Sequence, residues 1–308
     1  MNVVIIGSGS IGMLMAFYFT KLGCPVSLVT NRVEQADDLN QNGLHLFYSE
    51  KTIKKVSILA MNVQQLTQLT DVDLLIVTVK SHQVEHVIKQ IDENQLNIFS
   101  VLFLQNGMSH TELFHQISVP EIAVGVMEHG AMRTNNVTVR HTGIGMLKWS
   151  YVRQKSQFIE RLFSQLNEEH FPIEKQQNWK QLLQRKLVVN ACINPITAIF
   201  AIPNGMLVKN DYYFSMMRQV FVEVTDILGI ENQEGLWKYV CQVCEKTSRN
   251  RSSMLVDIDS HRETEVDSIV GYLLRQASAK QMNVPVLTFL YRAIRAKEQT
   301  YELGGTTL

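Results

Sequence analysis

The chain has 308 residues, of which 45% are apolar, so it is long enough for two domains with a hydrophobic core each. Lysine plus arginine and aspartate plus glutamate number 29 each, which gives a formal net charge of zero at neutral pH. This balance gives no electrostatic support for nucleic acid or an anionic membrane as a partner, and we expect neither. The most apolar long run, Leu187 to Ile202, is interrupted by polar residues and is shorter than the roughly 20 residues of a membrane span.

The N-terminus and the cysteines favour a cytoplasmic protein without disulfides. The chain opens on a strand-like segment, with no basic stretch followed by an apolar signal core, so the cytoplasm is the expected location.

Four cysteines (Cys24, Cys192, Cys241 and Cys244) are too few and too unevenly spread for a disulfide framework. The last two form a CxxC pair in a helix-like stretch. No second such pair and no histidine pair at zinc spacing accompanies them, so we interpret them as packing residues and expect no metal site.

A glycine-rich turn at the start of the chain predicts a dinucleotide site. The apolar strand Asn2 to Ile6 runs into Gly7-Ser8-Gly9-Ser10-Ile11-Gly12, and a helix-like run from Met13 to Leu22 follows. In this context the first glycine permits a tight turn, the second lets phosphate approach the main chain, and the third lets the helix pack close to the strand. The pyrophosphate would lie at the helix N-terminus, so we expect all six residues of the turn to bind the cofactor.

The end of the second strand favours NADP over NAD. Val26 to Thr30 leads into Asn31 and Arg32, about twenty residues past Gly12, where an NAD-binding protein usually has a carboxylate for the ribose hydroxyls. Neither residue is acidic, and a guanidinium can instead bind the adenosine 2′-phosphate through two hydrogen bonds. We expect Asn31 and Arg32 to contact the cofactor; the alternative is a solvated surface arginine.

In chain order, the next segments predict an α/β domain. Apolar strands over Leu74 to Val79 and Ser100 to Leu104 flank a helix-like run over His82 to Ile91. Continuous apolar strands predict a parallel sheet covered on both faces. Two further stretches, Ile122 to Met127 and Val137 to Leu147, are expected to complete or extend that sheet.

After Lys155 the periodicity becomes helical, which predicts an all-α second domain. Helix-like runs cover residues 156–166, 179–200, 211–228, 235–246, 265–280 and 284–303. The polar stretch Glu174 to Asn178 is the expected boundary, giving domains 1–175 and 176–308. Because no low-complexity linker separates them, we expect the domains to pack closely.

Polar residues follow two strands of the predicted sheet, where a cofactor bound across its carboxyl edge would meet them. Lys80 follows the Leu74 to Val79 strand, and Gln105-Asn106-Gly107 follows the Ser100 to Leu104 strand. Lys80 could offer an ammonium to cofactor or substrate, and Asn106 an amide to the nicotinamide ribose or a substrate oxygen. The alternatives are a solvated lysine and a plain Asn-Gly turn.

The long helix of the second domain carries an unusual polar pattern. Lys186, Asn190 and Asn194 recur at intervals of four, which places them along one face of an otherwise apolar helix. Buried amides without hydrogen bonds would cost about 1–3 kcal/mol each, so these side chains need partners or a polar cavity such as a substrate cleft. Pro195 predicts a kink or a break near Asn194. Alternatively, the amides bond to neighbouring backbone and the lysine extends to solvent.

A second polar group stands ahead of a later helix. Ser252-Ser253-Met254-Leu255-x-Asp257 is followed by Thr264, a candidate helix cap, and by Glu265 and Asp267, which we place in the first helical turn. Acidic residues there are stabilised by the helix dipole, so a purely structural role for Glu265 is the alternative.

Taken together, these motifs resemble the ketopantoate reductase family, the NADPH-dependent 2-dehydropantoate 2-reductases of pantothenate and coenzyme A biosynthesis. The resemblance runs the length of the chain, and it is the ordered set that is specific. Its residues are Gly7-x-Gly9-x-x-Gly12, Val79-Lys80, Gln105-Asn106-Gly107-Met108, Arg185-Lys186-Leu187-x-x-Asn190-x-x-x-Asn194-Pro195-x-Thr197-Ala198, Ser252-Ser253-Met254-Leu255-x-Asp257 and Thr264-Glu265-x-Asp267.

The resemblance implies a Rossmann domain followed by a helical domain like that of 6-phosphogluconate dehydrogenases. It implies that Lys186 is the general acid, that Glu265 assists it and contacts the cofactor, and that Asn190, Asn194 and Ser253 bind substrate. Lys80 and Asn106 match residues near the cofactor and the reacting carbon, and the enzyme would be a monomer or homodimer.

One segment departs from the family pattern. Glu128-His129-Gly130-Ala131 stands where many members have a threonine-rich segment, which leaves the wall of the cofactor pocket undetermined.

Two other functions remain open: a paralogous reductase of another branched 2-oxo acid, and a non-catalytic NADP-binding sensor.

Overall fold

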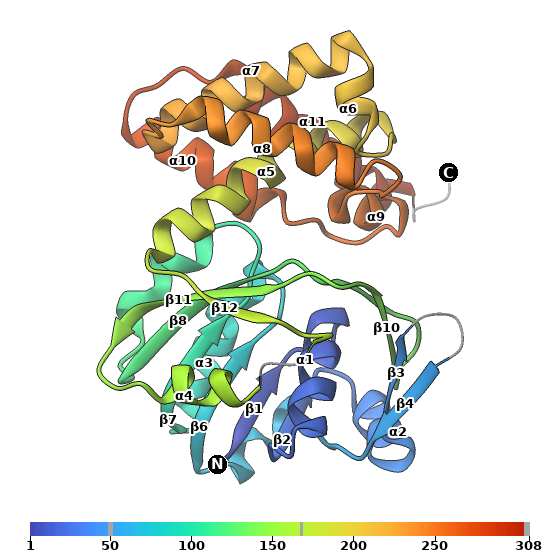
Figure 1. Ribbon diagram of the computed structural model, residues 1–308, viewed down its shortest axis with the longest axis vertical. Helices are drawn as coiled ribbons and strands as arrows, with labels where there is room; N and C mark the ends of the chain where they lie inside the picture. The colour runs from blue at the N-terminus through green and yellow to red at the C-terminus, as the bar shows by residue number, and fades with distance from the viewer. Residues whose placement is uncertain (49–51, 167–168, 305–308) are drawn as a thin grey trace. The chain divides into compact units, whose positions relative to one another are not determined.

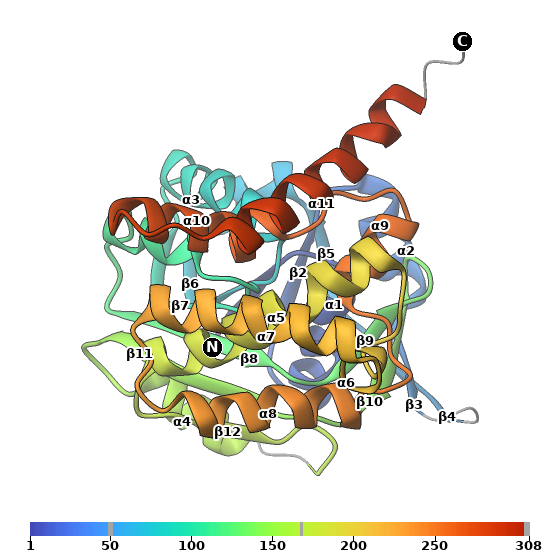
Figure 2. The ribbon, with the colours of Figure 1, turned by 90° about the horizontal axis from the view of Figure 1, so that it is seen from above.

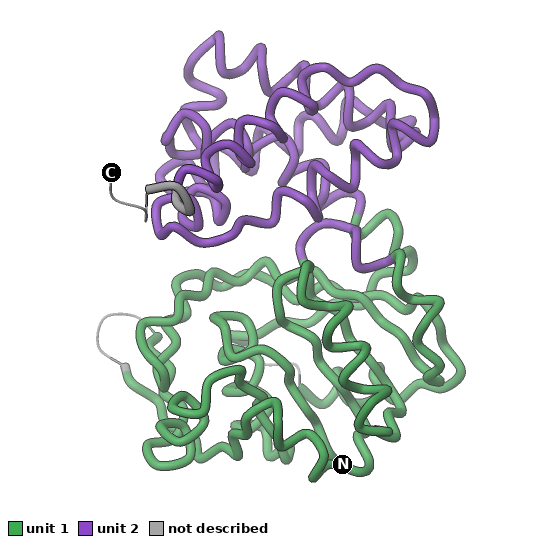
Figure 3. The backbone as a smooth tube through the Cα atoms, turned by 180° about the vertical axis from the view of Figure 1, so that it is seen from behind, with its two compact units in different colours: residues 1–105, 112–183 green, residues 106–111, 184–308 purple. Residues whose placement is uncertain are grey.

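The computed structural model describes residues 1–48, 52–166 and 169–304. The chain forms two compact units, one of residues 1–105 and 112–183, the other of residues 106–111 and 184–308 (Figure 3). The last residues of the predicted second domain, 305–308, lie outside the described part. The short segment 106–111 therefore belongs to the second unit although the chain on both sides of it belongs to the first.

The first unit is built on a largely parallel sheet. In the described residues its order is β12-β11-β8-β7-β6-β1-β2-β5, parallel from β8 to β5, with β11 antiparallel to β8 (Figure 1). This confirms the predicted Rossmann-type α/β domain. The strands are β1 (Val3–Ile6), β2 (Val26–Thr30), β5 (Leu59–Asn62), β6 (Asp71–Val77), β7 (Asn97–Phe103), β8 (Glu121–Met127), β11 (Leu147–Gln154) and β12 (Ile173–Lys175).

A second, smaller sheet corrects one expectation. Its order is β4-β3-β10-β9, formed by β3 (Leu44–Tyr48), β4 (Thr52–Val56), β9 (Gly130–Arg133) and β10 (Thr138–Gly143). The prediction that the Val137 to Leu147 stretch extends the main sheet was therefore wrong for β10; only Leu147 begins a strand of that sheet. β10 pairs instead with β3 in parallel and with β9 in antiparallel orientation.

Helix α1 (Ser10–Lys21) explains why a second sheet is needed. Residues 12–19 are all buried, and α1 contacts β1 and β2 of the main sheet as well as β3, β9 and β10 of the second. A helix that is apolar all round requires cover on every side, and the small sheet supplies it. The unit's other helices are α2 (Val33–Asn42), α3 (Val84–Glu93) and α4 (Phe158–Gln165), with 3-10 turns η1 (Val63–Gln68), η2 (Ser81–Gln83) and η3 (Ser109–Gln116).

The second unit is helical, as predicted. Figure 2 shows α7 beside α10 and α11, which it also contacts. Its elements are the greater part of α5 (Trp179–Phe200), then α6 (Met206–Lys209), α7 (Asp211–Leu228), α8 (Gln233–Lys246), α9 (Ser253–Asp259), the π-helical turn η4 (Asp267–Gly271), α10 (Tyr272–Ala279) and α11 (Pro285–Gly304).

Helix α5 runs unbroken through Pro195, so the option of a break was wrong. Residues 187–198 are all buried, and Lys186 just before them is half-buried. This packing holds the helix together despite the missing N–H of Pro195. The Thr197 hydroxyl lies 2.8 Å from the Ile193 carbonyl oxygen and 3.1 Å from that of Asn194, adding hydrogen bonding next to the proline.

The cysteines are free and mostly buried. Cys244 Sγ lies 3.9 Å from Met217 Sδ, and burial raises the pKa of the Cys244 thiol to about 12. In the described ranges no three or more His, Cys, Asp or Glu side chains gather as metal ligands would. Nor does any helix of these ranges combine the length and apolar character needed to cross a bilayer.

Candidate active site

The glycine turn lies between β1 and α1, and two of its glycines are sterically obligatory. Gly7 has φ +116°, and a Cβ there would lie 2.7 Å from Thr78 Oγ1. A Cβ at Gly12 would lie 1.7 Å from the Gly7 carbonyl oxygen. The Thr78 hydroxyl donates to that oxygen at 2.8 Å, which ties the turn to the end of β6.

Gly9, in contrast to Gly7 and Gly12, has open space beside its Cα. A Cβ there would meet no atom within 4 Å, and the residue is exposed at the N-terminus of α1, where no side chain caps the helix. Ser8 is buried, its hydroxyl donating to Gln35 Oε1 at 2.8 Å, while Ser10 and Ile11 are half-buried. An uncapped helix N-terminus beside an open glycine fits the pyrophosphate of a dinucleotide.

Arg32 follows β2 and is exposed. Its Nη2 donates to Gln35 Oε1 at 3.1 Å and to Asn136 Oδ1 at 2.7 Å. Nε and Nη1 make no hydrogen bond to any residue in the described part of the chain, so three of the five N–H groups remain for a ligand. The neighbouring Asn31 is exposed as well.

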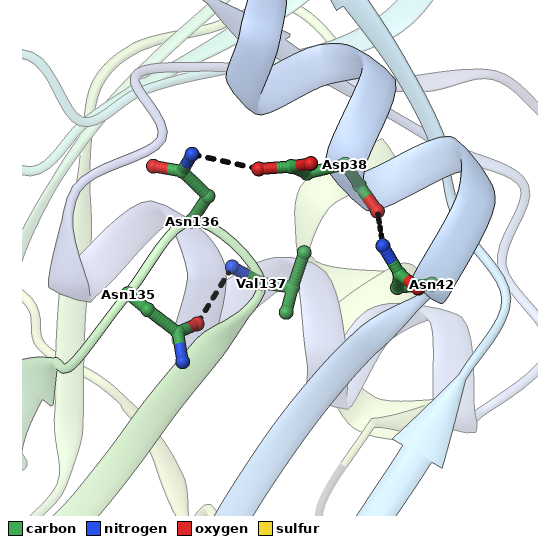
Figure 4. A pocket seen from close by; sticks show the side chains of 5 residues that line it. All are labelled: Asp38, Asn42, Asn135, Asn136 and Val137. Carbon is green, nitrogen blue, oxygen red and sulfur yellow. Dashed lines mark hydrogen bonds between the residues drawn. The ribbon is translucent and has the colours of Figure 1, made fainter.

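Asn136 joins Arg32 to a shallow polar hollow. Its Nδ2 donates to Asp38 Oδ2 at 2.8 Å, so the carboxylate is linked to Arg32 only through the amide (Figure 4). The hollow has a volume of about 330 Å³ and is lined by Asp38, Asn42, Asn135, Asn136 and Val137. None of the glycine-turn residues lines it, so it lies outside the predicted cofactor turn.

The two strand ends carry their polar residues in different ways. Lys80 is half-buried and precedes η2, with an extended backbone (φ −62°, ψ 152°). Gln105 is buried, and its Nε2 donates to the Val77 carbonyl at 2.8 Å and the Val79 carbonyl at 3.0 Å. Gln105 thus fastens the ends of β6 and β7 to each other.

Asn106 and Glu265, two predicted site residues far apart in sequence, are hydrogen-bonded to each other in the second unit. Asn106 Nδ2 donates to Glu265 Oε2 at 2.8 Å. The adjacent Gly107 has φ +78°, and a Cβ there would lie 2.1 Å from the Ser268 carbonyl oxygen. Met108 N donates to that same oxygen at 3.1 Å. The chain therefore bends at Asn106-Gly107, close against the Ser268 carbonyl, with the Asn106 amide directed at Glu265.

Glu265 itself is placed differently from the expectation. It precedes the helix that starts at Val266 instead of lying in the first turn, where only Asp267 is found. The Glu265 carbonyl accepts from Ile269 N at 3.1 Å, and Thr264 Oγ1 accepts from Val266 N at 3.2 Å. Glu265 therefore lies at the helix boundary, and its carboxylate accepts a hydrogen bond from Asn106.

Lys186, Asn190 and Asn194 all lie on α5 at the predicted spacing. Lys186 is half-buried, while Asn190 and Asn194 are 7% and 6% exposed. Neither amide hydrogen-bonds a described residue, and neither has polar atoms sealed from solvent. The alternative in which the amides bond to neighbouring backbone is thus wrong: two nearly buried amides retain their hydrogen-bonding groups for a ligand.

Two adjacent serines at the start of α9 differ in role. Ser252 is buried, and its oxygen caps α9 by accepting from Leu255 N at 3.1 Å. It also lies 2.8 Å from Thr197 Oγ1 on α5. Ser253, the predicted substrate ligand, is exposed and is the first residue of the helix.

Sequence reasoning missed two residues beside the glycine turn. Gln35 is fully buried and accepts from Ser8, and Arg133 at the end of β9 donates to the Ser8 carbonyl at 3.4 Å. The segment flagged as a departure from the family pattern leads into β9, and its His129 is buried, with Nδ1 3.0 Å from His141 Nε2. No local sequence signal links Arg133 to the turn, because the connection exists only through the second sheet.

Two family models match the chain. The model for Ketopantoate reductase PanE/ApbA covers residues 3–154, and that for the Ketopantoate reductase PanE/ApbA C terminal covers residues 178–298. The chain belongs to the ketopantoate reductase family. The two matches confirm the family that the motifs predicted. As a ketopantoate reductase, the protein is an oxidoreductase.

Individual ketopantoate reductases match over nearly their whole length. The chain is 40% identical over 300 residues to the 2-dehydropantoate 2-reductase of Bacillus subtilis (strain 168), covering 97% of this chain and 98% of that protein. It is 36% identical over 299 residues to the enzyme of the same name from Listeria innocua, covering 96% and 97%.

Solved structures show the same fold. The crystal structure of a probable 2-dehydropantoate 2-reductase, panE, from Bacillus subtilis matches with TM-score 0.87 at 40% identity, covering 96% of this chain and 100% of that one. The ternary structure of D-mandelate dehydrogenase with NADH and anilino(oxo)acetate also has TM-score 0.87, at 21% identity, covering 97% and 99%. At that identity the likeness shows the fold alone.

Proposed function

We propose that the protein reduces 2-dehydropantoate to (R)-pantoate with NADPH, as a step of pantothenate and coenzyme A synthesis in the cytoplasm. The observation that carries the proposal is the polar face of α5, where Lys186 precedes two nearly buried amides that hydrogen-bond none of the described residues. Whole-length similarity to curated 2-dehydropantoate 2-reductases supports the choice of substrate.

We assign cofactor binding to domain 1–175 and substrate binding to domain 176–308. The glycine turn Gly7 to Gly12 would hold the pyrophosphate, with Asn31, Arg32 and Lys80 along the cofactor. Asn106 and Glu265, which are hydrogen-bonded to each other, would contact cofactor and substrate. A nicotinamide cofactor is part of the family's reaction, and it supplies a hydride to the ketone carbon when bound. NADPH is the finer part of the proposal and depends on Arg32.

Lys186 is the proposed general acid. Negative charge develops on the ketone oxygen as its carbon is reduced, and an ammonium both stabilises that charge and donates the proton. Asn190, Asn194 and the Ser253 hydroxyl would bind the polar groups of the substrate. A substrate that lacked those groups would leave two nearly buried amides unpaired, which penalises its binding.

Glu265 is proposed to keep Lys186 charged and oriented. Its carboxylate is fixed by the 2.8 Å hydrogen bond from Asn106, so one oxygen has a defined position.

A second candidate function is the reduction of another branched 2-oxo acid with the same machinery. The fold is compatible with it, because D-mandelate dehydrogenase matches with the same TM-score and one fold thus carries enzymes with differently named substrates. Residues on α5 and α9 would then select a different side chain on the acid. A non-catalytic NADP-binding sensor would have no use for Lys186 and Glu265 together.

The direct test is oxidation of the reduced cofactor by the purified protein. NADPH absorbance is followed on addition of 2-dehydropantoate, of 2-oxoisovalerate and of other branched 2-oxo acids, with NADH in parallel. We expect the highest kcat/KM with 2-dehydropantoate and NADPH. A strong preference for another acid would replace the substrate and retain the chemistry, and no turnover with any acid would reject the enzyme. Sedimentation of the same sample decides between the proposed monomer and homodimer.

A further inference from the structure

Two arginines converge on one side-chain oxygen next to the glycine turn. Arg32 Nη2 lies 3.1 Å from Gln35 Oε1, and Arg133 Nη1 lies 3.3 Å from the same atom. Arg32 follows β2, whereas Arg133 ends β9 in the second sheet. Both arginine side chains are exposed, whereas the glutamine that accepts their hydrogen bonds is fully buried.

This corner is fixed to the cofactor turn. Ser8 Oγ donates to Gln35 Oε1 at 2.8 Å, and Gln35 Nε2 lies 3.2 Å from the Ser8 carbonyl. Arg133 Nη1 is 3.4 Å from that carbonyl as well. A ligand held by the turn through its pyrophosphate would therefore have both guanidiniums at a set distance from the phosphate site.

The two neighbouring guanidiniums of Arg32 and Arg133 form a positively charged site that suits an anion. Two guanidiniums that share a neutral acceptor repel each other, and a doubly charged anion between them would turn that repulsion into attraction. The carboxylate of Asp38 bonds Asn136 and not Arg32, so Arg32 keeps Nε and Nη1 for a ligand within the described part of the chain. The adenosine 2′-phosphate is the dianion that the end of β2 would meet.

We propose that Arg133 is a second residue that binds the 2′-phosphate of NADPH and that it sets cofactor specificity together with Arg32. This inference depends on the proposed NADPH-dependent function. It adds a contact from the second sheet, which is absent from the strand–turn–helix pattern at the N-terminus. The two guanidiniums, which both lie next to Gln35 Oε1, would each donate hydrogen bonds to the phosphate.

The test replaces Arg133 by glutamine and compares ligands with and without the phosphate. Dissociation constants are measured for NADPH, NADH, 2′,5′-ADP and 5′-ADP in the parent, Arg133→Gln and Arg32→Gln proteins. Arg140→Gln is the matched control, because Arg140 is exposed on the neighbouring β10 and lies over the Phe47 ring. Thermal unfolding of each variant reports folding.

Loss of one charge-assisted contact predicts that Arg133→Gln binds NADPH and 2′,5′-ADP about tenfold or more weakly. NADH and 5′-ADP affinities stay at the parent value, and Arg140→Gln changes none of them. If only Arg32→Gln reduces the preference, or if Arg133→Gln weakens all four ligands equally, the role of Arg133 is refuted while NADPH remains. If the parent protein itself binds NADPH no better than NADH, the proposed cofactor NADPH is rejected, and the role of Arg133 is rejected with it.

Discussion

Gly9 and Gly12 lie three residues apart and are glycine for different reasons. Added atoms at Gly12 would overlap the Gly7 carbonyl, so this glycine is required by the fold itself. At Gly9 the added atoms would meet only open space, and the backbone there (φ −76°) suits any residue. The fold itself therefore does not require glycine at position 9, which fits the proposed approach of a pyrophosphate to the main chain.

Substitution by alanine separates these two roles. Gly9→Ala is expected to leave the midpoint of thermal unfolding unchanged and to weaken NADPH binding at least about tenfold, or about 1.4 kcal/mol. Gly12→Ala is expected to lower the free energy of unfolding by about 1–3 kcal/mol or more, because backbone must move. Calorimetry and cofactor titration measure both quantities. Unchanged NADPH affinity in Gly9→Ala would show that the pyrophosphate does not approach this turn.

At this scale the sequence predicted residues that belong to local motifs and missed those joined through the fold. The turn, Arg32 and the α5 polar residues were recognised because strand–turn–helix order and helical spacing are visible in the sequence. The Asn106 to Glu265 hydrogen bond joins residues that are 159 positions apart, and Gln35 is an ordinary polar residue until the fold buries it. Asn106 and Glu265 were each predicted as site residues, but no local pattern pairs them, and Gln35 was not predicted.

Two neighbouring serines show how α9 is attached to α5. Ser252 caps α9 and contacts Thr197, the residue that lies in hydrogen-bonding distance of two α5 carbonyls beside Pro195. Ser253 is exposed and takes no part in that cap. The same helix start thus provides a structural residue and, next to it, a proposed substrate ligand.

Alanine at Ser252 should therefore reduce stability, and alanine at Ser253 should instead weaken substrate binding. Ser252→Ala is expected to cost about 1–2 kcal/mol of unfolding free energy, since a cap and a buried partner are lost together. Ser253→Ala should change stability by less than about 0.5 kcal/mol and raise KM for the 2-oxo acid. Urea unfolding and steady-state kinetics on both variants measure this. The assignment of Ser253 fails if its variant has the parent's KM.

Helices of the second unit were easier to predict than strands of the first. Trp179 to Phe200 and Asp211 to Leu228 were predicted to the residue, because a long 3.6 periodicity fixes a helix by itself. A short strand such as β10 fits either sheet equally well on its own pattern. The missed clue was α1, whose apolar residues on every side required a second covering layer.

Across the first unit, a chain of buried rings connects α1 to the second sheet. Tyr18 Oη lies 3.0 Å from His141 Nδ1, and His141 Nε2 lies 3.0 Å from His129 Nδ1. His129 Nδ1 also accepts from Gly145 N at 3.2 Å, so it carries no proton. His141 must then donate to His129 through Nε2, and His129, whose Nδ1 carries no proton, is neutral in this arrangement.

Burial, followed by the neighbouring charge of His141, lowers the pKa of His129 to about 4, and burial also lowers the pKa of His141. Because the unfolded histidines bind protons near their ordinary pKa of 6.5, the folded state loses stability as pH falls below 6.5 toward 4. The loss is at most about 1.4 kcal/mol per pH unit for each histidine.

Urea unfolding at pH 8, 6 and 4.5 tests this. His129→Gln keeps a donor and an acceptor without titrating, so its stability should fall less steeply with acidification than the parent's. His86→Gln, exposed on α3, is the control and should follow the parent. An equal slope in the His129 variant would place the acid sensitivity elsewhere.

The central claim is that the polar face of α5 carries the acid of a reductase. The most direct measurement is single-turnover NADPH oxidation by Lys186→Ala in the presence of 2-dehydropantoate, with cofactor affinity determined on the same sample. Lys180→Ala is the control, because Lys180 is exposed near the start of the same helix. We expect the Lys186 variant to react about 10²-fold to 10⁴-fold more slowly with nearly unchanged NADPH binding, and the Lys180 variant to match the parent. Equal rates for the Lys186 variant and the parent would contradict the account.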